Sequence, residues 1–505
     1  MPMNASKSLA FVSLGCPKNL VDTERMLGKL AQDGYALVPE IEGADVVVVN
    51  TCGFIESARQ ESMATIQEML NLKKEGKVGA VVVAGCLVER QREELLTTLP
   101  DVDRMIGVFA REEIVQVTNQ ANPYHSIPAL ASTTVATNTV SIPITNRTKS
   151  DDASLNDSSS DLSTDSLGIA ELPINKMIQE QRQLFRPAPV TALEDTARLR
   201  ITPKHYAYLK ISEGCDRLCT FCAIPKMRGK HVTKPIEEVI REAKELAQDG
   251  VRELIIVAQD STYYGMDLYG KVRLAELLRE LSQIDGIEWI RLLYAYPEHI
   301  TAELLQTLAQ TPKLLPYIDM PLQHINNRML KRMQRRVDRN EIESLIGQLR
   351  TAIPNLVFRT TFIVGFPGET DEEFAELADF IQQQKFERLG VFTYSFEPGT
   401  PATKLDGHLP EEVKEHRRDE LMKLQQPIAF SFAQSQIGKE LELIIDGPDP
   451  EFPQYLSARS YADSPEIDTL IRVKGKKLRS GDLVKGKITS ADGYDLIAKT
   501  IGQVR

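Results

Sequence analysis

The chain has 505 residues, of which 42% are hydrophobic and 26% charged, and its formal net charge is −11. This length exceeds what one hydrophobic core supports, so we expect several domains. The acidic balance excludes a protein built mainly to coat nucleic acid, but not one with a local basic patch. No apolar run approaches the roughly 20 residues that cross a bilayer, and the first residues lack a signal-peptide pattern. We therefore expect a cytoplasmic protein with no membrane contact.

Residues 7–120 alternate between valine-rich strands and amphipathic helices. The strands "AFVSL", "DVVVVN" and "AVVVAG" are continuously apolar, and each is followed by a helical stretch such as "NLVDTERMLGKLAQDG". Continuous apolar strands separated by helices predict a parallel sheet that is covered on both faces. A cysteine follows each of these strands, at positions 16, 52 and 86.

The composition changes after residue 120. Residues 126–170 are rich in Ser, Thr, Asp and Asn and show no hydrophobic period. Such a segment cannot bury enough apolar surface to fold alone. We expect residues 121–200 to form a low-complexity insertion or linker, with a phosphorylated or partner-binding tail as the alternative.

Between residues 201 and 432 the alternation of strand and helix returns. We expect an open, barrel-like parallel sheet of six strand–helix units, a (β/α)6 arrangement short of a full barrel. Lys210, Arg291, Asp319 and Arg359 occupy strand positions where a closed apolar barrel would penalise charge. They either line a ligand cavity or face outward at strand ends. The expected strands cover 206–212, 253–259, 288–294, 315–321, 357–365 and 388–395.

The last part of the chain shows a connecting helix at 410–437 and then short strands with Gly and Asp turns. This pattern predicts a small β-barrel, to which we assign residues 433–505. The predicted fold class is therefore α/β, with an N-terminal parallel sheet domain, a central open barrel and a terminal small β-barrel.

The chain has only six cysteines, and they form two groups of three. One group, Cys215, Cys219 and Cys222, lies in "GCDRLCTFC", directly after the first strand of the central part. A [4Fe–4S] cluster needs four ligands, and no cysteine remains to complete either group. One iron would then be open to an outside ligand. Structural zinc is the alternative, but it takes four protein ligands and usually another spacing.

This spacing of Cys-x₃-Cys-x₂-Cys resembles the signature of the radical S-adenosylmethionine superfamily. The resemblance implies that S-adenosylmethionine chelates the open iron and is cleaved to methionine and a 5′-deoxyadenosyl radical. It also implies that Phe221 packs beside the adenine. In "AQDST" (258–262), where the superfamily usually has Gly-Gly-Glu, Gln259 and Asp260 are the candidates for contacting the amino group.

"IVGFPGET" (363–370) supplies a glycine-rich bend after the fifth strand of the central part. Gly365 and Gly368 would let the backbone approach the cofactor there. His324, in "PLQHINN" after the fourth strand, either contacts cofactor or substrate or is a satisfied core histidine.

Cys16, Cys52 and Cys86 each follow a strand of the first sheet. Parallel strands end at the same edge of a sheet, where ligands bind, and the neighbouring glycines at 15, 53 and 85 let the backbone crowd close to a bulky group. A single buried cysteine is often only a packing residue. Three at matching strand ends favour a second iron–sulfur cluster, again with an unfilled position.

The combination of these parts resembles the methylthiotransferase family. The segments "SLGCPKNLVDTE", "NTCGFIESARQES", "DMPLQHINNRMLKRMQR" and "RSYADSPEID" are similar to the branch that modifies ribosomal protein S12. The resemblance implies two [4Fe–4S] clusters, the N-terminal one carrying the methylsulfide, and a terminal TRAM domain that binds substrate. It implies methylthiolation of the β-carbon of an aspartate. No side-chain acid or base is expected to catalyse the reaction, because the cofactors carry the chemistry.

Several alternatives remain at this stage. The sister branch of the family methylthiolates an adenosine of transfer RNA. Residues 438–505 have 11 Lys and Arg against 11 Asp and Glu, which does not favour RNA, although 472–487 is basic. A non-enzymatic iron–sulfur protein, either an electron carrier or an RNA-binding sensor, would instead have fully ligated clusters. Reductive cleavage of S-adenosylmethionine would also require an electron donor such as flavodoxin or ferredoxin.

Overall fold

The computed structural model describes residues 7–122, 186–475 and 477–503, and most of the expected insertion at 121–200 lies outside this part. The chain divides into two compact units, Met1–Pro187 and Ala188–Arg505. Among the described residues, no helix is both long enough and apolar enough to cross a membrane.

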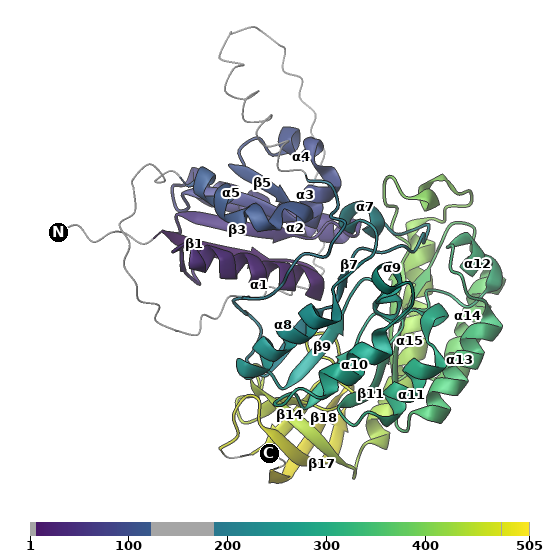
Figure 1. Cartoon of the computed structure of the whole chain (residues 1–505). Coiled ribbons are helices and arrows are strands. Elements are labelled where there is room, and N and C mark those ends of the chain that lie inside the picture. The colour runs from purple at the N-terminus through teal and green to yellow at the C-terminus, as the bar shows by residue number, and fades with distance from the viewer. Residues whose placement is uncertain (1–6, 123–185, 476, 504–505) are drawn as a thin grey trace. The chain divides into compact units, whose positions relative to one another are not determined.

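The first unit contains a five-stranded parallel sheet in the order β2-β1-β3-β4-β5 (Figure 1). Every residue of β3 and β4 is buried, which agrees with the prediction of a sheet covered on both faces. Because crossovers between parallel strands are right-handed, α1 and α2 lie on opposite faces. The elements are β1 (Ser8–Ser13), α1 (Pro17–Gln32), β2 (Ala36–Leu37), β3 (Val46–Thr51), α2 (Glu56–Lys74), β4 (Ala80–Gly85), α3 (Cys86–Gln91), α4 (Glu93–Thr98), β5 (Arg104–Gly107), η1 (Val108–Glu113) and α5 (Ile114–Ala121).

The second unit contains six parallel strands in the order β13-β12-β11-β10-β9-β6, which confirms the expected open (β/α)6 sheet (Figure 1). The strands are β6 (Tyr206–Lys210), β9 (Glu253–Val257), β10 (Trp289–Leu292), β11 (Leu314–Asp319), β12 (Val357–Val364) and β13 (Arg388–Thr393). The helices around the sheet are α7 (Ile224–Arg228), α8 (Ile236–Gln248), α9 (Met266–Tyr269), α10 (Leu274–Ser282), α11 (Ala302–Gln310), α12 (Asn327–Arg332), α13 (Arg339–Ala352) and α14 (Asp371–Gln384). A short antiparallel pair, β7 (Ser212–Glu213) and β8 (Val232–Thr233), follows β6.

A closed five-stranded barrel ends the chain, as expected, after the long helix α15 (Glu411–Ser435). Its strands are β14 (Glu440–Pro448), β15 (Leu456–Arg459), β16 (Ile471–Lys474), β17 (Leu483–Asp492) and β18 (Asp495–Gln503). It belongs to the same compact unit as the six-stranded sheet.

The segment 459–468 of this barrel contacts the residues with which the six strands begin. Arg459 donates to Glu253 at 2.5 Å, and Arg291 donates to the other oxygen of Glu253 at 2.8 Å and to the carbonyl of Tyr461 at 2.7 Å. Burial alone would raise the pKa of Glu253, but Arg459 and Arg291 outweigh it and lower that pKa. Removing either partner of such a buried pair would leave an uncompensated charge.

The charged strand residues are therefore satisfied by protein groups. Lys210, Arg291 and Asp319 are at most 2% exposed, so the expectation that they face outward is wrong. Lys210 lies 3.0 Å from Glu213, and Asp319 lies 2.7 Å from Arg359. A buried charge persists only with such a partner.

Candidate functional site

Cys16, Cys52 and Cys86, which we call the strand-end trio, lie at one edge of the first sheet. Cys16 precedes α1, Cys52 follows β3, and Cys86 is the first residue of α3. Their strands β1, β3 and β4 are neighbours and stay in register to their ends. Neighbouring strands lie roughly 4.8 Å apart. The structure thus brings together three cysteines that are far apart in the sequence.

Two glycines show how closely the three strand ends approach one another. A Cβ atom on Gly15 would lie 2.8 Å from Cβ and 3.1 Å from Sγ of Cys52, and one on Gly53 would lie 2.7 Å from the carbonyl oxygen of Cys86. Real Cβ atoms do not tolerate the shorter contacts. Glycine is therefore required for the loops of the strand-end trio to touch.

Asn19 on α1 joins two of these strand ends. Its side-chain amide donates to the carbonyl of Leu14 at 2.6 Å and to that of Thr51 at 3.3 Å, and the residue is 1% exposed. Asn50 in turn donates to the carbonyl of Asn19 at 3.0 Å. The sequence analysis missed both asparagines, although they lie three residues from Cys16 and two from Cys52.

Cys215, Cys219 and Cys222, which we call the loop trio, lie in the loop between β7 and α7. The loop is held at several backbone positions. The amide of Cys215 donates to the carbonyl of Gly229, that of Cys222 to the carbonyl of Cys219, and that of Thr220 to the carbonyl of Met333. The Thr220 hydroxyl also donates to the carbonyl of Arg332 at 2.8 Å. These bonds fold the loop over itself and attach it to the segment after α12.

The thiols of the loop trio lie close enough to influence one another. Burial is the main cause that raises the pKa of Cys215 to about 12, and negative charge on Cys219 adds to it. Burial also raises the pKa of Cys222, with contributions from Cys219 and Cys215. Without a cation these thiolates are disfavoured, because they are desolvated and repel one another. A positively charged metal group would offset both effects.

Arg335 places a cation beside the loop trio. Its guanidinium donates to Sγ of Cys219 at 3.7 Å and to the carbonyl of Pro321 at 2.6 Å, and it lies 4.1 Å from the ring centroid of Tyr296. Arg217 lies on the same ring at 3.9 Å and is bonded to Asp260. Neither arginine was singled out from the sequence, since a run such as "KRMQRRVDR" looks like a solvated face.

All six cysteines belong to the described part of the chain, and each is a thiol rather than half of a disulfide. Within residues 7–122, 186–475 and 477–503, no three His, Cys, Asp or Glu side chains already stand in the geometry of a metal site. The donor chemistry nevertheless fits iron–sulfur ligation, which uses thiolates.

Gln259 and Asp260, both predicted to contact a cofactor, differ in whether hydrogen bonds within the protein already occupy their side-chain oxygens. Asp260 accepts from Arg217 with one oxygen and from Thr262 and the amide of Tyr263 with the other. Gln259 donates to Glu213 at 2.7 Å, while its Oε1 atom is buried and accepts no hydrogen bond in the described structure. Such an atom requires an explanation. Gln259 is thus the better candidate.

Gln323 is a second amide of this kind, and the sequence analysis missed it. It has a positive φ of 75°, and its Oε1 is buried with no hydrogen-bond partner among the described residues. Its backbone joins the end of β12 by bonds to Thr361 and Ile363. A strained residue with an orphaned polar atom at the carboxyl end of a parallel sheet is typical of a ligand site.

Glu213 connects the loop trio to the end of β6. It accepts hydrogen bonds from Lys210 at 3.0 Å, from Arg228 at 3.2 Å and from Gln259, and it is 3% exposed. It lies two residues before Cys215. This buried network sets the position from which the cysteine loop starts.

The other predicted cofactor residues are accounted for by protein contacts. Phe221 packs edge-to-face on Phe366 with ring centroids 6.4 Å apart. Gly365 and Gly368 have positive φ values of 70° and 80°, and added Cβ atoms would meet the side chains of Lys414 and Arg332. Their contacts with a cofactor stay a prediction.

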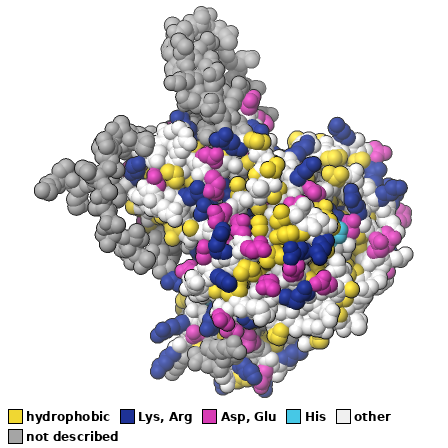
Figure 2. Space-filling model, in the orientation of Figure 1, with side chains coloured by type: hydrophobic (Ala, Val, Ile, Leu, Met, Phe, Trp, Pro, Cys, Tyr) yellow, Lys and Arg dark blue, Asp and Glu magenta, His cyan; other side chains and the backbone are white. Residues whose placement is uncertain are grey.

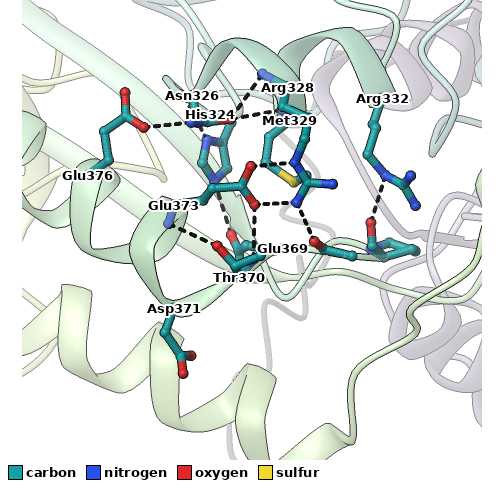
Figure 3. A network of polar contacts seen from close by, with 12 residues as sticks. His324, Asn326, Arg328, Met329, Arg332, Glu369, Thr370, Asp371, Glu373 and Glu376 are labelled. Atoms are coloured by element: carbon teal, nitrogen blue, oxygen red, sulfur yellow. Dashed lines mark hydrogen bonds and ion pairs between the residues drawn. The ribbon is translucent and has the colours of Figure 1, made fainter.

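His324 is a satisfied core histidine (Figure 3). Its Nδ1 accepts from the amide of Asn326 at 3.0 Å, so Nε2 carries the proton and donates to Glu369, also at 3.0 Å. Arg328 donates to both oxygens of Glu373 in the same network, and Asn326 donates to Glu376. The network joins the segment around α12 to α14, and so supports the segment that carries Arg335.

Comparison with known proteins agrees with this arrangement. Residues 8–107 match the model described as "Uncharacterized protein family UPF0004", residues 209–381 match the radical SAM superfamily, and residues 437–501 match the TRAM domain. A solved structure of the radical S-adenosylmethionine methyltransferase TsrM from Kitasatospora setae has a TM-score of 0.50 and 14% identity, and covers 79% of this chain and 74% of its own. That likeness shows the fold. The chain is a radical S-adenosylmethionine methylthiotransferase.

The more similar relatives define the particular family. The ribosomal protein uS12 methylthiotransferase RimO of Clostridioides difficile is 41% identical over 98% of both chains. That of Aquifex aeolicus is 42% identical over 97% of this chain and 96% of its own. The chain belongs to the ribosomal protein uS12 methylthiotransferase family.

Proposed function

We propose that this protein transfers a methylthio group to ribosomal protein uS12 (S12), at the β-carbon of an aspartate. The observation that carries the proposal is the relationship at 41% identity over 98% of the chain to a protein named for that activity. The aligned residues include the N-terminal sheet and the terminal barrel, and so extend beyond the radical S-adenosylmethionine domain. Because the substrate is a ribosomal protein, we place the enzyme in the cytoplasm.

The loop trio would hold the [4Fe–4S] cluster that cleaves S-adenosylmethionine, and the strand-end trio a second cluster that carries the sulfur. Bound there, these groups supply a one-electron reductant and a sulfur donor. The chain contributes three thiolates to each and leaves one iron of each open. Glycines at positions 15 and 53 let the loops of the strand-end trio approach one another, and Arg335 balances charge at the loop trio.

The orphaned amide oxygens of Gln259 and Gln323 support the binding of S-adenosylmethionine beside the loop trio. Each Oε1 is a buried acceptor without a donor in the described structure. The amino group and the ribose hydroxyls of S-adenosylmethionine are donors that would satisfy such atoms. Gln259 is oriented by its bond to Glu213, and Gln323 by the backbone of β12.

The structure of the terminal barrel is weaker evidence for a protein substrate than its sequence alone. Residues 444–468 are acidic, which by itself would suit a basic ribosomal protein. Asp463 instead lies 2.7 Å from Arg388, Asp468 accepts from Tyr317, and Asp446 lies 2.7 Å from His205. These carboxylates hold the barrel to the six-stranded sheet. On the face drawn in Figure 2, Lys and Arg side chains are interspersed with Asp and Glu and form no single basic field of the kind RNA requires.

The first test is a transfer assay with anaerobically reconstituted protein, S-adenosylmethionine and a strong reductant. Purified uS12 and transfer RNA are offered in parallel and followed by mass spectrometry. We expect a methylthio gain on uS12 alone. A gain on the RNA alone would keep the chemistry and overturn the substrate. No gain on either, together with no 5′-deoxyadenosine, would overturn the proposed enzyme.

A further inference from the structure

A groove of about 430 Å³ lies directly beside the loop trio. One wall is Leu218, a member of the cysteine loop whose side chain is 63% exposed. The rest comes from α12 and the segment that follows it, including Lys331, Gln334, Arg335 and Arg336. None of the residues that line it belongs to a strand of the six-stranded sheet.

The charges of this segment are not equivalent. Residues 327–339 contain six Lys and Arg and one acidic residue, Asp338. Arg328, Arg332 and Arg339 are ion-paired with carboxylates of neighbouring segments. Arg335 is 9% exposed and is held by Cys219, Pro321 and Tyr296.

Lys331 and Arg336 differ from these four. Both are exposed, and within the described residues neither side chain has an ion pair or hydrogen bond. Both line the groove with Leu218. The groove therefore presents two unpaired cations around an exposed leucine. Its one carboxylate, Asp338, accepts from the amide of Glu341.

Hydrogen bonds connect the segment that lines the groove to the loop trio. The backbone and hydroxyl of Thr220 bond the carbonyls of Met333 and Arg332. Arg335, at the floor of the groove, reaches Sγ of Cys219, the residue next to Leu218. A protein seated in the groove would thus lie one residue from a proposed ligand of the cluster.

We propose that this groove, made by Leu218, Lys331, Gln334 and Arg336, is the docking surface for an acidic one-electron carrier protein. The inference rests on the proposed function, since it assumes the cluster on the loop trio. In the step that docking permits, the carrier is oxidised by one electron and the cluster is reduced by one electron. No bond is made or broken in that step.

Two observations favour a carrier over a substrate. Two cations around one exposed leucine fit a small, transient contact of the electron-transfer kind, whereas RNA needs many phosphate contacts. A basic groove attracts an acidic partner and repels a basic one, which ribosomal proteins generally are because they bind RNA.

The test compares two reductants in the holoenzyme. The charge-reversed variant Lys331→Glu with Arg336→Glu is measured beside a matched control, Lys244→Glu with Lys271→Glu, whose two lysines are exposed elsewhere in the same unit. The probes are a purified, fully reduced bacterial flavodoxin and dithionite. Readouts are the rate of cluster reduction by electron paramagnetic resonance, the formation of 5′-deoxyadenosine, and binding of flavodoxin to the chain without its cofactors.

We expect the groove variant to lose roughly tenfold or more in flavodoxin affinity and in flavodoxin-driven reduction, with weaker dependence on salt. Its dithionite-driven reduction and the control variant should change less than about twofold on the same reasoning. Equal losses with both reductants would overturn the docking surface, as would unchanged flavodoxin reduction with weakened binding of uS12 or transfer RNA. Absence of cleavage in the unaltered enzyme with dithionite would instead contradict the proposed function.

Discussion

In the first unit each cysteine of the strand-end trio follows its own strand, whereas in the second unit the whole loop trio lies between β7 and α7. The first arrangement depends on strand register and on the glycines that let neighbouring loops touch. The second depends on hydrogen bonds that attach one loop to distant segments. The comparison shows that three cysteines can be brought together either by a sheet edge or by a tethered loop.

The sheets beneath the two trios differ as well. β3 and β4 are buried along their whole length and present mainly valine. The six-stranded sheet includes Glu253, Arg291 and Lys210, each fully or nearly fully buried with a charged partner. A sheet covered by helices on both faces needs only apolar side chains. The strands of the second sheet begin against the segment 459–468. They therefore need charged side chains that pair with the arginine and the carboxylates of that segment.

The largest expected effect separates the two trios chemically. Replacing any member of the loop trio by Ala should reduce 5′-deoxyadenosine formation to background, because the cluster loses one of its three protein ligands. Replacing any member of the strand-end trio should leave that cleavage detectable and abolish methylthio transfer. Both products are measured by mass spectrometry after anaerobic reconstitution. If strand-end variants also lost cleavage, the division of labour would be wrong.

A second prediction concerns the charged sheet. Glu253→Gln should lower the free energy of unfolding of the second unit by about 3–5 kcal/mol, since two buried arginines lose their carboxylate. The pKa of Glu253 is lowered in the folded state, so its stabilisation is present above the unfolded pKa of about 4 and is lost as pH falls below it. Urea unfolding between pH 7 and pH 3, followed by hydrogen exchange, checks both statements.

The control for this prediction is the first unit of the same variant. Hydrogen-exchange protection of β3 and β4 should not change, because the chain forms two compact units. An equal stability loss at pH 3 and pH 7 relative to the unaltered protein would contradict the role assigned to the ionised carboxylate.

A third prediction tests the support of the strand-end trio. Asn19→Ala leaves the carbonyls of Leu14 and Thr51 without their buried donor, which should cost about 2 kcal/mol of stability in the first unit. Occupancy of the cluster on the strand-end trio should fall, while that of the loop trio should not. Iron content is best measured in a Cys215→Ala background, where the strand-end site is isolated. Asn19→Asp, which keeps the size but removes the donor, should not restore it.

The smallest expected effect is at the loop trio. Thr220→Val removes the hydroxyl bond to the carbonyl of Arg332 but keeps the backbone bond to Met333. The cost should be about 1 kcal/mol, seen as faster loss of iron from the loop trio in a Cys16→Ala background. Thr220→Ser should behave like the unaltered protein. Equal iron loss from Thr220→Ser and Thr220→Val would show that packing, rather than the hydroxyl, holds the loop.

Much of this architecture could be predicted from the sequence, because valine-rich strands and the spacing of Cys215, Cys219 and Cys222 are local signals. The position of the strand-end trio could also be predicted, because parallel strands end at the same edge of a sheet. The supports could not be predicted in this way. Asn19 reaches Thr51 across 32 positions of the chain, and nothing in a local pattern marks such a contact.

The charged strand residues show where a sequence pattern was misleading. Asp319 and Arg291 looked like lumen or edge residues, and the acidic section 444–468 looked like a surface for a basic partner. The structure joins the two regions, because Arg291 bonds the backbone of Tyr461, and Arg388 bonds Asp463. Only a tertiary contact between parts far apart in the sequence explains both patterns.

The segment 459–468 also has a consequence for evolution and engineering. Terminal barrels of this kind look like modules that one enzyme could exchange with another to read a new substrate. Here Glu253, Arg291 and Arg388 are matched residue by residue to that segment. A transplanted barrel that lacked the segment would remove Arg459 from Glu253, the carbonyl of Tyr461 from Arg291, and Asp463 from Arg388. Exchange of the barrel would therefore succeed only when the donor barrel includes the segment 459–468. Otherwise the charged residues of the recipient sheet would have to be replaced as well.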